Sequence, residues 1–152
     1  NHPNIVTVFE LVRSAQAPAI AMELVAGQVL REFCGTSLPL RRVLLIGEQI
    51  ANALTAAHAA GIVHGGLSPD NIMVRTDGVV KVLDFGLVKA LDEKEQGGGD
   101  LSGTPLYMSP EAIQTPELVD ARSDLYAVGA VGYFLLTGQT VFGARTLGEL
   151  CQ

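Results

Sequence analysis

Two apolar segments at the start of the chain have the pattern of β-strands. Residues 5–12 and 19–25 are rich in β-branched and other apolar side chains, which is typical of strands. Pro18 falls in the loop between them, and Gly27 ends the second segment. A short helix is expected to follow over residues 29–33.

Between residues 40 and 60 the apolar positions change to a helical spacing. Side chains three or four residues apart form one apolar face, which predicts a long helix against a core; they are Val43, Ile46, Ile50, Leu54 and Ala57. Ser37 is expected to cap the start of this helix and Gly61 to end it. His58 lies on it, and we expect a packed or half-exposed histidine there rather than a ligand.

Two short apolar runs then flank the sequence Arg-Thr-Asp-Gly at residues 75–78. Asp-Gly between alternating apolar runs is a strong signal for a β-hairpin. Asn71 precedes the first run and Asp84 ends the second, so the hairpin should bring an amide oxygen and a carboxylate together. Two such oxygens in a cleft suit a hard cation such as Mg²⁺.

The rest of the chain is predicted to be loop and helix, which makes the fold α+β and mostly helical. Helices are expected over 109–113, from Asp120 or Arg122 to 136, and over 144–152. The middle one is apolar on almost every side, ends at Gly138, and is typical of a buried central helix. Asp124 near its start would need hydrogen-bond partners if buried. Residues 88–103, with a charged run and three consecutive glycines, are expected to form a mobile loop.

Composition and charge limit the possible partners. The chain has 152 residues, 48% hydrophobic and 17% charged, with a mean hydropathy of +0.33, so some apolar surface is expected to be covered. The net charge of −6 argues against nucleic acid and against an anionic membrane surface, because both require basic residues.

Localisation is predicted to be cytoplasmic. No secretory leader is visible, and the longest apolar run, 125–136, is shorter than the roughly 20 residues of a membrane span. Membrane contact is therefore expected only through segments outside this chain. Cys34 and Cys151 lack metal-site spacing and are expected to be reduced. Because the chain starts without methionine and stops within a helical pattern, we expect a fragment of a longer protein.

Three short motifs follow one another along the chain. They are His-Gly-Gly-Leu-Ser-Pro-Asp-Asn at 64–71, Asp-Phe-Gly at 84–86 and Ser-Pro-Glu at 109–111. In this order they resemble the catalytic loop H-R-D-L-x-x-x-N, the D-F-G and the A-P-E of the protein kinase family, of the eukaryotic-like (Hanks-type) Ser/Thr class. Gly-Thr-Pro-Leu-Tyr at 103–107 is similar to the family's substrate-docking loop.

The resemblance implies a partial kinase domain. Residues 1–25 would be the last two strands of the N-terminal lobe with the hinge, and 26–152 the C-terminal lobe without its last helices. The Gly-rich loop, the ATP-binding lysine and its glutamate partner would precede Asn1. ATP and Mg²⁺ are the cofactors implied, and a protein substrate or protein partner the ligand.

The resemblance also implies roles for individual residues. Adenine would contact Met22 as gatekeeper, backbone groups of Glu23 and Val25, and Met73 below the base. Mg²⁺ would bind Asn71 and Asp84. His64 and Phe85 would pack together in the internal spine, and Asp124 would bind the backbone of the catalytic loop. The activation and substrate segment would include Ser102, Thr104 and Glu111.

The chain departs from the family at the positions that perform transfer. Gly66 replaces the catalytic Asp, and Ser68 replaces the Lys that neutralises the transferring phosphoryl group. Gly65 replaces the Arg that pairs with a phosphorylated activation loop. Asp70 lies four residues after Gly66, at a position that faces outward in the family, and is not expected to substitute as the base.

Three functions follow from this pattern. The favoured one is a pseudokinase that binds Mg–ATP, protein partners or both, with little phosphotransfer. The first alternative is an active Ser/Thr protein kinase, a transferase that moves the ATP γ-phosphate to a protein hydroxyl. The second alternative is a truncated, non-functional gene product.

Overall fold

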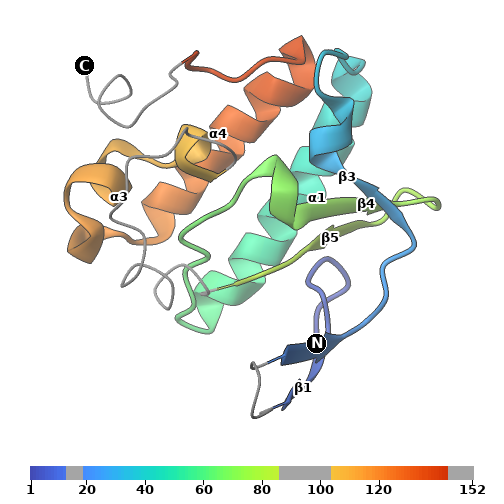
Figure 1. Cartoon of the computed structure of the whole chain (residues 1–152), viewed down its shortest axis with the longest axis vertical. Helices are drawn as coiled ribbons and strands as arrows, with labels where there is room; N and C mark the ends of the chain where they lie inside the picture. Colours follow the sequence, from blue (N-terminus) through green and yellow to red (C-terminus); the bar gives the residue numbers. More distant parts are fainter. Residues whose placement is uncertain (13–18, 86–103, 144–152) are drawn as a thin grey trace.

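The computed structural model describes residues 1–12, 19–85 and 104–143, which form two small antiparallel sheets and a group of helices (Figure 1). One sheet has two strands in the order β1-β2, and the other has three in the order β3-β4-β5. The architecture is α+β, as the sequence predicts.

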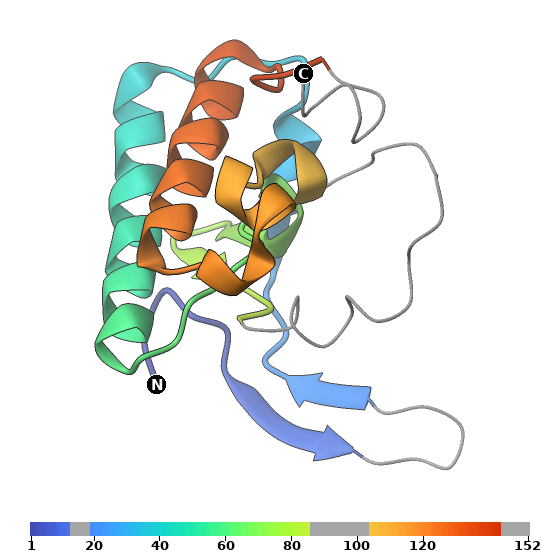
Figure 2. The ribbon, with the colours of Figure 1, turned by 90° about the vertical axis from the view of Figure 1, so that its left-hand side faces the viewer.

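The first sheet pairs β1 (Val8–Val12) with β2 (Ala19–Met22), and its register shifts between Val8 and Glu10. The predicted strand over 5–12 begins later than expected, because residues 4–6 pair elsewhere. Ile5 forms a parallel bridge with Val82 of β5, and Val6 N donates to Val82 O at 2.9 Å. The N-terminal turn therefore joins the second sheet, whereas the β1–β2 hairpin projects from the body (Figure 2).

The second sheet contains the predicted hairpin. β4 (Ile72–Arg75) pairs with β5 (Val80–Val82), and Gly78 has the positive φ of 86° that the turn requires. β3 (Gly27–Val29) was not predicted; it takes Val29 from the expected helix, of which only a 3₁₀ helix, η1 (Leu30–Phe33), forms. A Cβ on Gly27 would lie 2.2 Å from Val74 O, so this strand pairing requires glycine.

Helix α1 (Leu40–Ala59) confirms the predicted long helix, and all five predicted apolar positions are buried. The predicted cap is wrong: Pro39 is the N-cap and no side chain caps the helix. Leu38 N donates to Leu135 O at 2.8 Å, so the chain is still bound to another helix after Ser37. Gly61, at φ 74°, follows the helix end as expected.

The C-terminal elements surround one more long helix. The 3₁₀ helices η3 (Thr104–Tyr107) and η4 (Pro116–Leu118) flank α3 (Pro110–Gln114), which Ser109 caps through Ala112 N. Helix α4 (Ala121–Thr137) starts at the N-cap Asp120 and ends at Gly138, φ 73°. These bounds agree with the predicted helices.

Helix α4 packs beside α1 (Figure 2), but it is less buried than the predicted central helix. Its inward residues, among them Val131, Phe134 and Leu135, join the core. Leu125, in contrast, is 60% exposed, and Tyr133 and Leu136 are also exposed. The described elements cover only one face of this apolar helix.

Some predictions lie outside the described residues: the mobile loop over 88–103, the helix over 144–152, and Cys151. Cys34 is a free, exposed cysteine. Of the helices in the described ranges, none combines the length and the hydropathy that crossing a membrane requires.

Candidate functional site

The loop from Ile62 to Asn71 connects α1 with β4, and Asp124 of α4 holds it from below. Asp124 is 1% exposed. Its carboxylate accepts hydrogen bonds from His64 N and Gly65 N, each at 2.9 Å, and lies 2.8 Å from His58 Nε2. This is the backbone contact that the resemblance implies for Asp124. His58 is half-buried and serves as a third partner of the same carboxylate.

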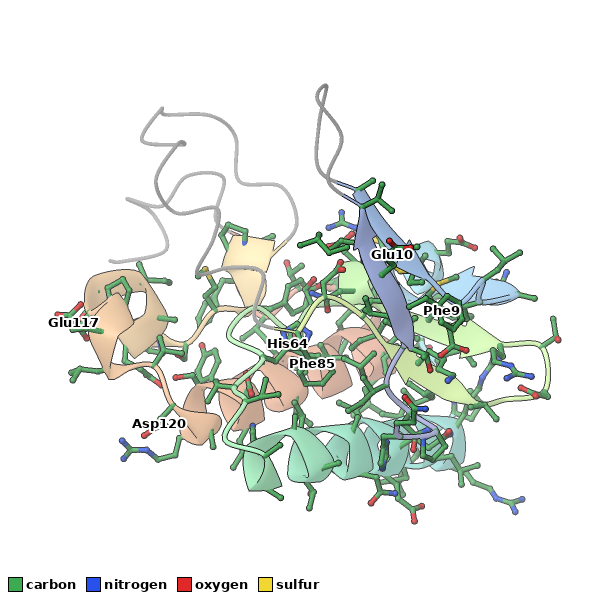
Figure 3. All side chains as sticks on the ribbon, turned by 90° about the horizontal axis from the view of Figure 1, so that it is seen from below. Phe9, Glu10, His64, Phe85, Glu117 and Asp120 are labelled. Carbon is green, nitrogen blue, oxygen red and sulfur yellow. The ribbon has the colours of Figure 1, made fainter. Side chains whose placement is uncertain are left out.

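His64 is buried in the loop with both ring nitrogens engaged. Gly66 N donates to Nδ1 at 3.3 Å, so Nε2 bears the proton and donates to Leu83 O at 2.9 Å. Burial lowers the pKa of His64, and the bond to Leu83 opposes that shift only in part. The ring also packs on Phe85, with centroids 4.7 Å apart (Figure 3). His64 is therefore a neutral link between the loop and the segment after β5.

The two glycines after His64 differ in conformation. Gly65 has a φ of 76°, a left-handed value that favours glycine, whereas Gly66 is buried and lacks a positive φ. Gly66 occupies the position of the catalytic Asp in the motif, and it offers only backbone groups. Its carbonyl oxygen accepts from Asn71 Nδ2 at 2.8 Å.

Ser68 and Asn71 close the loop into a short 3₁₀ helix, η2 (Pro69–Asn71). Ser68 Oγ accepts from Asp70 N at 3.3 Å, and Asn71 Oδ1 accepts from Ser68 N at 2.9 Å. Ser68 is completely buried. Its hydroxyl therefore serves as a helix cap, and it brings no charge to the loop.

Asp84 is the second residue after β5 and lies beside this loop. Leu83 N donates to Asn71 O at 2.8 Å, which places Asp84 one residue beyond a direct backbone contact with Asn71. Asp84 is exposed and has a φ of 62°, the only positive value for a non-glycine residue in the described part of the chain. A left-handed aspartate is uncommon, and such conformations concentrate at functional sites.

Asn71 and Asp84 fit a hard cation in their donor chemistry. The Asn71 amide oxygen accepts one hydrogen bond and retains a second lone pair. No group of three or more His, Cys, Asp or Glu residues suited to a metal occurs in the described ranges. A cation here would take two protein oxygens and complete its shell with water or phosphate oxygens, as Mg²⁺ commonly does.

A cavity of about 210 Å³ lies between the β1–β2 hairpin and the end of β5. Met22, Asp84 and Phe85 line it together with apolar residues of the N-terminal turn and β1. The fold thus brings three of the predicted site residues to one cavity. Glu23, Val25 and Met73 are not among its lining residues; Met73 lies in β4, opposite Lys81 and Val29.

Asp70, the nearest carboxylate in sequence to Gly66, is already paired. It forms a bidentate ion pair with Arg31 of η1. The hydrogen bonds that Arg31 donates to Asp70 raise the pKa of the Arg31 guanidinium. This pairing leaves Asp70 poorly suited to replace a catalytic base.

The activation and substrate segment is only partly described. Ser102 lies outside the described residues, and Thr104 is the first residue of η3. Glu111 accepts from Ser123 Oγ at 2.7 Å, and this bond lowers the pKa of Glu111.

Sequence reasoning missed the polar contacts of two residues, Lys81 and Asn4. Lys81 of β5 pairs with Glu23, and Asn4 donates to Gln49 Oε1 and to Val80 O. The only local signal was a lysine between Val80 and Val82 in an otherwise apolar strand. Its partner is distant in the sequence and could not be identified from the pattern.

Comparison with known proteins agrees with these motifs. The family model of the protein kinase domain matches residues 1–150. Serine/threonine-protein kinase pkn3 of Myxococcus xanthus is 44% identical over 154 residues, 93% of this chain and 28% of the relative. Pkn1 of the same organism is 44% identical over 152 residues, 96% of this chain and 22% of the relative.

PknL of Mycobacterium tuberculosis, also a serine/threonine-protein kinase, is 38% identical over 145 residues, 93% of this chain. The chain spans between 22% and 36% of the length of these three relatives.

Proposed function

Because the chain belongs to the protein kinase family, we propose that it is part of a pseudokinase, which binds Mg–ATP or protein partners but transfers phosphate poorly. The observation that carries this proposal is Gly66. The family's catalytic residue at that position accepts or orients the proton of the substrate hydroxyl. Glycine has no side chain for this task, and general-base assistance contributes roughly 10²–10⁴-fold to a rate.

Ser68 supports the same conclusion. A lysine at this position would neutralise charge on the transferring phosphoryl group, and electrostatic stabilisation supplies most of phosphoryl-transfer catalysis. The Ser68 hydroxyl bonds Asp70 N instead. Asp70 in turn pairs with Arg31, which argues against its use as a substitute base.

Asn71 and Asp84 support retained binding of Mg–nucleotide. Both residue types are the metal ligands of the family motif, and Asp84 lines a cavity with Met22, the proposed gatekeeper. Mg²⁺ held by these two oxygens would neutralise phosphate charge. Glu23, Val25 and Met73 would complete the adenine contacts in the whole domain.

An active Ser/Thr kinase is the second candidate. Asp84 and Phe85, together with the Thr104 and Glu111 motifs, favour it, because they correspond to parts that working kinases use. It would require another group to act as the base in place of Gly66.

The test compares nucleotide binding with phosphotransfer in the full-length protein. We expect Mg–ATP to raise the unfolding temperature of the wild type, since binding at 100 times Kd stabilises by about 2.7 kcal/mol. Asp84→Ala should remove this shift. Asp77→Ala, a matched change at the exposed turn of the same hairpin, should retain it.

A generic Ser/Thr substrate should receive no phosphate from the wild type above background. Phosphotransfer by the wild type that disappears in Asp84→Ala would instead establish the active kinase. No shift with Mg–ATP would exclude nucleotide binding.

A further inference from the structure

An ion pair joins the two sheets at the place where they meet. Lys81 Nζ donates to Glu23 Oε1 at 2.7 Å, and the lysine side chain is 8% exposed. Lys81 is the central residue of β5, whereas Glu23 directly follows β2. The pair therefore connects the strand that leads to Asp84 with the hairpin that contains Met22.

Both ends of the β1–β2 hairpin are held by this pair. Thr7, just before β1, donates its backbone N to Glu23 Oε1 at 2.8 Å, and Glu23 N donates to Thr7 O at 2.9 Å. Lys81 Nζ also lies 3.4 Å from Ile5 O. One carboxylate and one ammonium group thus bind the chain entering the hairpin and the chain leaving it.

The hairpin has little other cover in the described part of the chain. Its large side chains face solvent, with Phe9 69% exposed and Val8 56% exposed (Figure 3). Apolar packing on that side therefore contributes little to fixing its orientation. Met22 of the hairpin and Asp84 after β5 line the same cavity, so a change in the orientation of the hairpin would change their separation.

We propose that Glu23 and Lys81 are positioning residues, whose ion pair fixes the β1–β2 hairpin against β5 and thereby sets the cavity between Met22 and Asp84. The expected effect of this pair on nucleotide affinity rests on the proposed function. Its effect on the orientation of the hairpin does not depend on that function.

The electrostatics of the pair agree with this role. Lys81 is largely removed from water, and a buried charge without its partner is costly. The hydrogen bond from Lys81, followed by the one from Thr7 N, holds the pKa of Glu23 below its usual value. Glu23 is therefore ionised near neutral pH, and removal of its carboxylate leaves the largely buried Lys81 side chain without its partner.

Hydrogen exchange in the full-length protein tests the effect on the hairpin. Glu23→Gln keeps an oxygen for Thr7 N and removes only the charge, and Lys81→Met removes the ammonium group but keeps the length of the chain. In both variants, amides of residues 8–12 and 19–22 should exchange about tenfold faster, as expected for the loss of a partly buried pair. Amides of residues 43–57 in α1 should be unchanged.

Two further variants separate charge pairing from general stability. Arg75→Met breaks the Arg75–Asp77 pair, whose side chains are 42% and 49% exposed, and should change neither segment. Lys81→Arg, which keeps a positively charged donor for Glu23, should retain most of the protection in the hairpin. Equal acceleration in α1 and the hairpin, no acceleration in the hairpin with Glu23→Gln and Lys81→Met, or the same acceleration in Lys81→Arg as in Lys81→Met would overturn the proposal.

Mg–ATP titration of the same variants provides the functional measurement. If the wild type binds, both single variants should weaken binding about tenfold while Arg75→Met retains wild-type affinity; unchanged affinity in the single variants would overturn the link to the cavity. If the wild type does not bind, the nucleotide-binding part of the proposed function fails, and the exchange experiment still decides the role of the pair in the hairpin.

Discussion

Asp124 bonds three donors with one carboxylate while it is 1% exposed. Its replacement leaves two backbone N–H groups of the loop without an acceptor. Each buried donor that loses its partner costs about 1–3 kcal/mol. The loop around Gly66 therefore depends on a residue distant in sequence, and its shape does not require a catalytic side chain.

Asp124→Ala should lower the free energy of unfolding by about 3 kcal/mol or more, because buried donors are left unpaired. The control is Asp120→Ala at the N-cap of the same helix, where loss of the cap to Arg122 N should cost about 1 kcal/mol. Urea denaturation measures both. Equal losses would show that the loop does not depend on Asp124.

His64 predicts a dependence of stability on pH. Burial lowers its folded-state pKa from the ordinary 6.5, although the nearby Asp124 and Asp84 carboxylates oppose the shift. The unfolded chain therefore binds the proton more readily. This contribution to stability is complete above pH 6.5 and is lost as the pH falls toward the folded-state value.

Unfolding free energies measured between pH 7.5 and 5 should fall more steeply for the wild type than for His64→Phe. The variant should be less stable at every pH, because it loses the bond to Leu83 O, but its slope should be smaller. Parallel slopes would mean that His64 is not the group responsible.

At the scale of elements, the long helix α1 and the β4–β5 hairpin could be predicted from the sequence. The short strand β3 could not. The apolar face of α1 repeats over five positions, and the β4–β5 turn contains Asp-Gly, so both have strong local signals. β3 is three residues long, and only its partner β4 makes it a strand. The cap at Ser37 failed because tertiary bonds to α4 decide where α1 begins.

Two helices end at glycines with nearly the same backbone but different surroundings. Gly61 has a φ of 74° and no atom within 4 Å of an added Cβ; Gly138 has a φ of 73°, and its Cβ would lie 2.7 Å from Thr36 N. Gly61→Ala should therefore cost only backbone strain, about 1 kcal/mol. Gly138→Ala should cost about 2–3 kcal/mol, since displacement of the neighbouring chain adds to the strain.

Thermal or urea unfolding of the two variants side by side measures this difference. Equal losses, or a larger loss for Gly61→Ala, would contradict the close contact between the end of α4 and the chain at residues 35–36.

At the scale of the whole molecule, the motifs could be located in the sequence. The side-chain contacts that hold these motifs in place could not be predicted from it. The positions of Gly66, Ser68, Asn71 and Asp84 follow from motif order alone. The Asp124 bonds were expected only through the family resemblance. The Glu23–Lys81 pair was missed, because the two residues are brought together by the meeting of two sheets and no local pattern encodes it.

The exposed face of α4 could not be predicted from the sequence either. Its composition predicted a central, buried helix, yet burial depends on which elements cover it. Leu125 at 60% exposed and Leu24 at 96% exposed show how much apolar surface the described elements leave open. The mean hydropathy of the chain indicates that apolar surface is left open, but it does not indicate where that surface lies.

We propose that this chain keeps the metal-binding half of a phosphotransfer site, whereas the half that performs the transfer is replaced. The decisive measurement is phosphotransfer from labelled ATP to a generic Ser/Thr substrate, by the full-length wild type and by Gly66→Asp with Ser68→Lys. We predict background transfer for the wild type and at least about 100-fold more for the double variant, the lower range of general-base assistance. Transfer by the wild type equal to that of the double variant would show that Gly66 and Ser68 do not limit phosphotransfer.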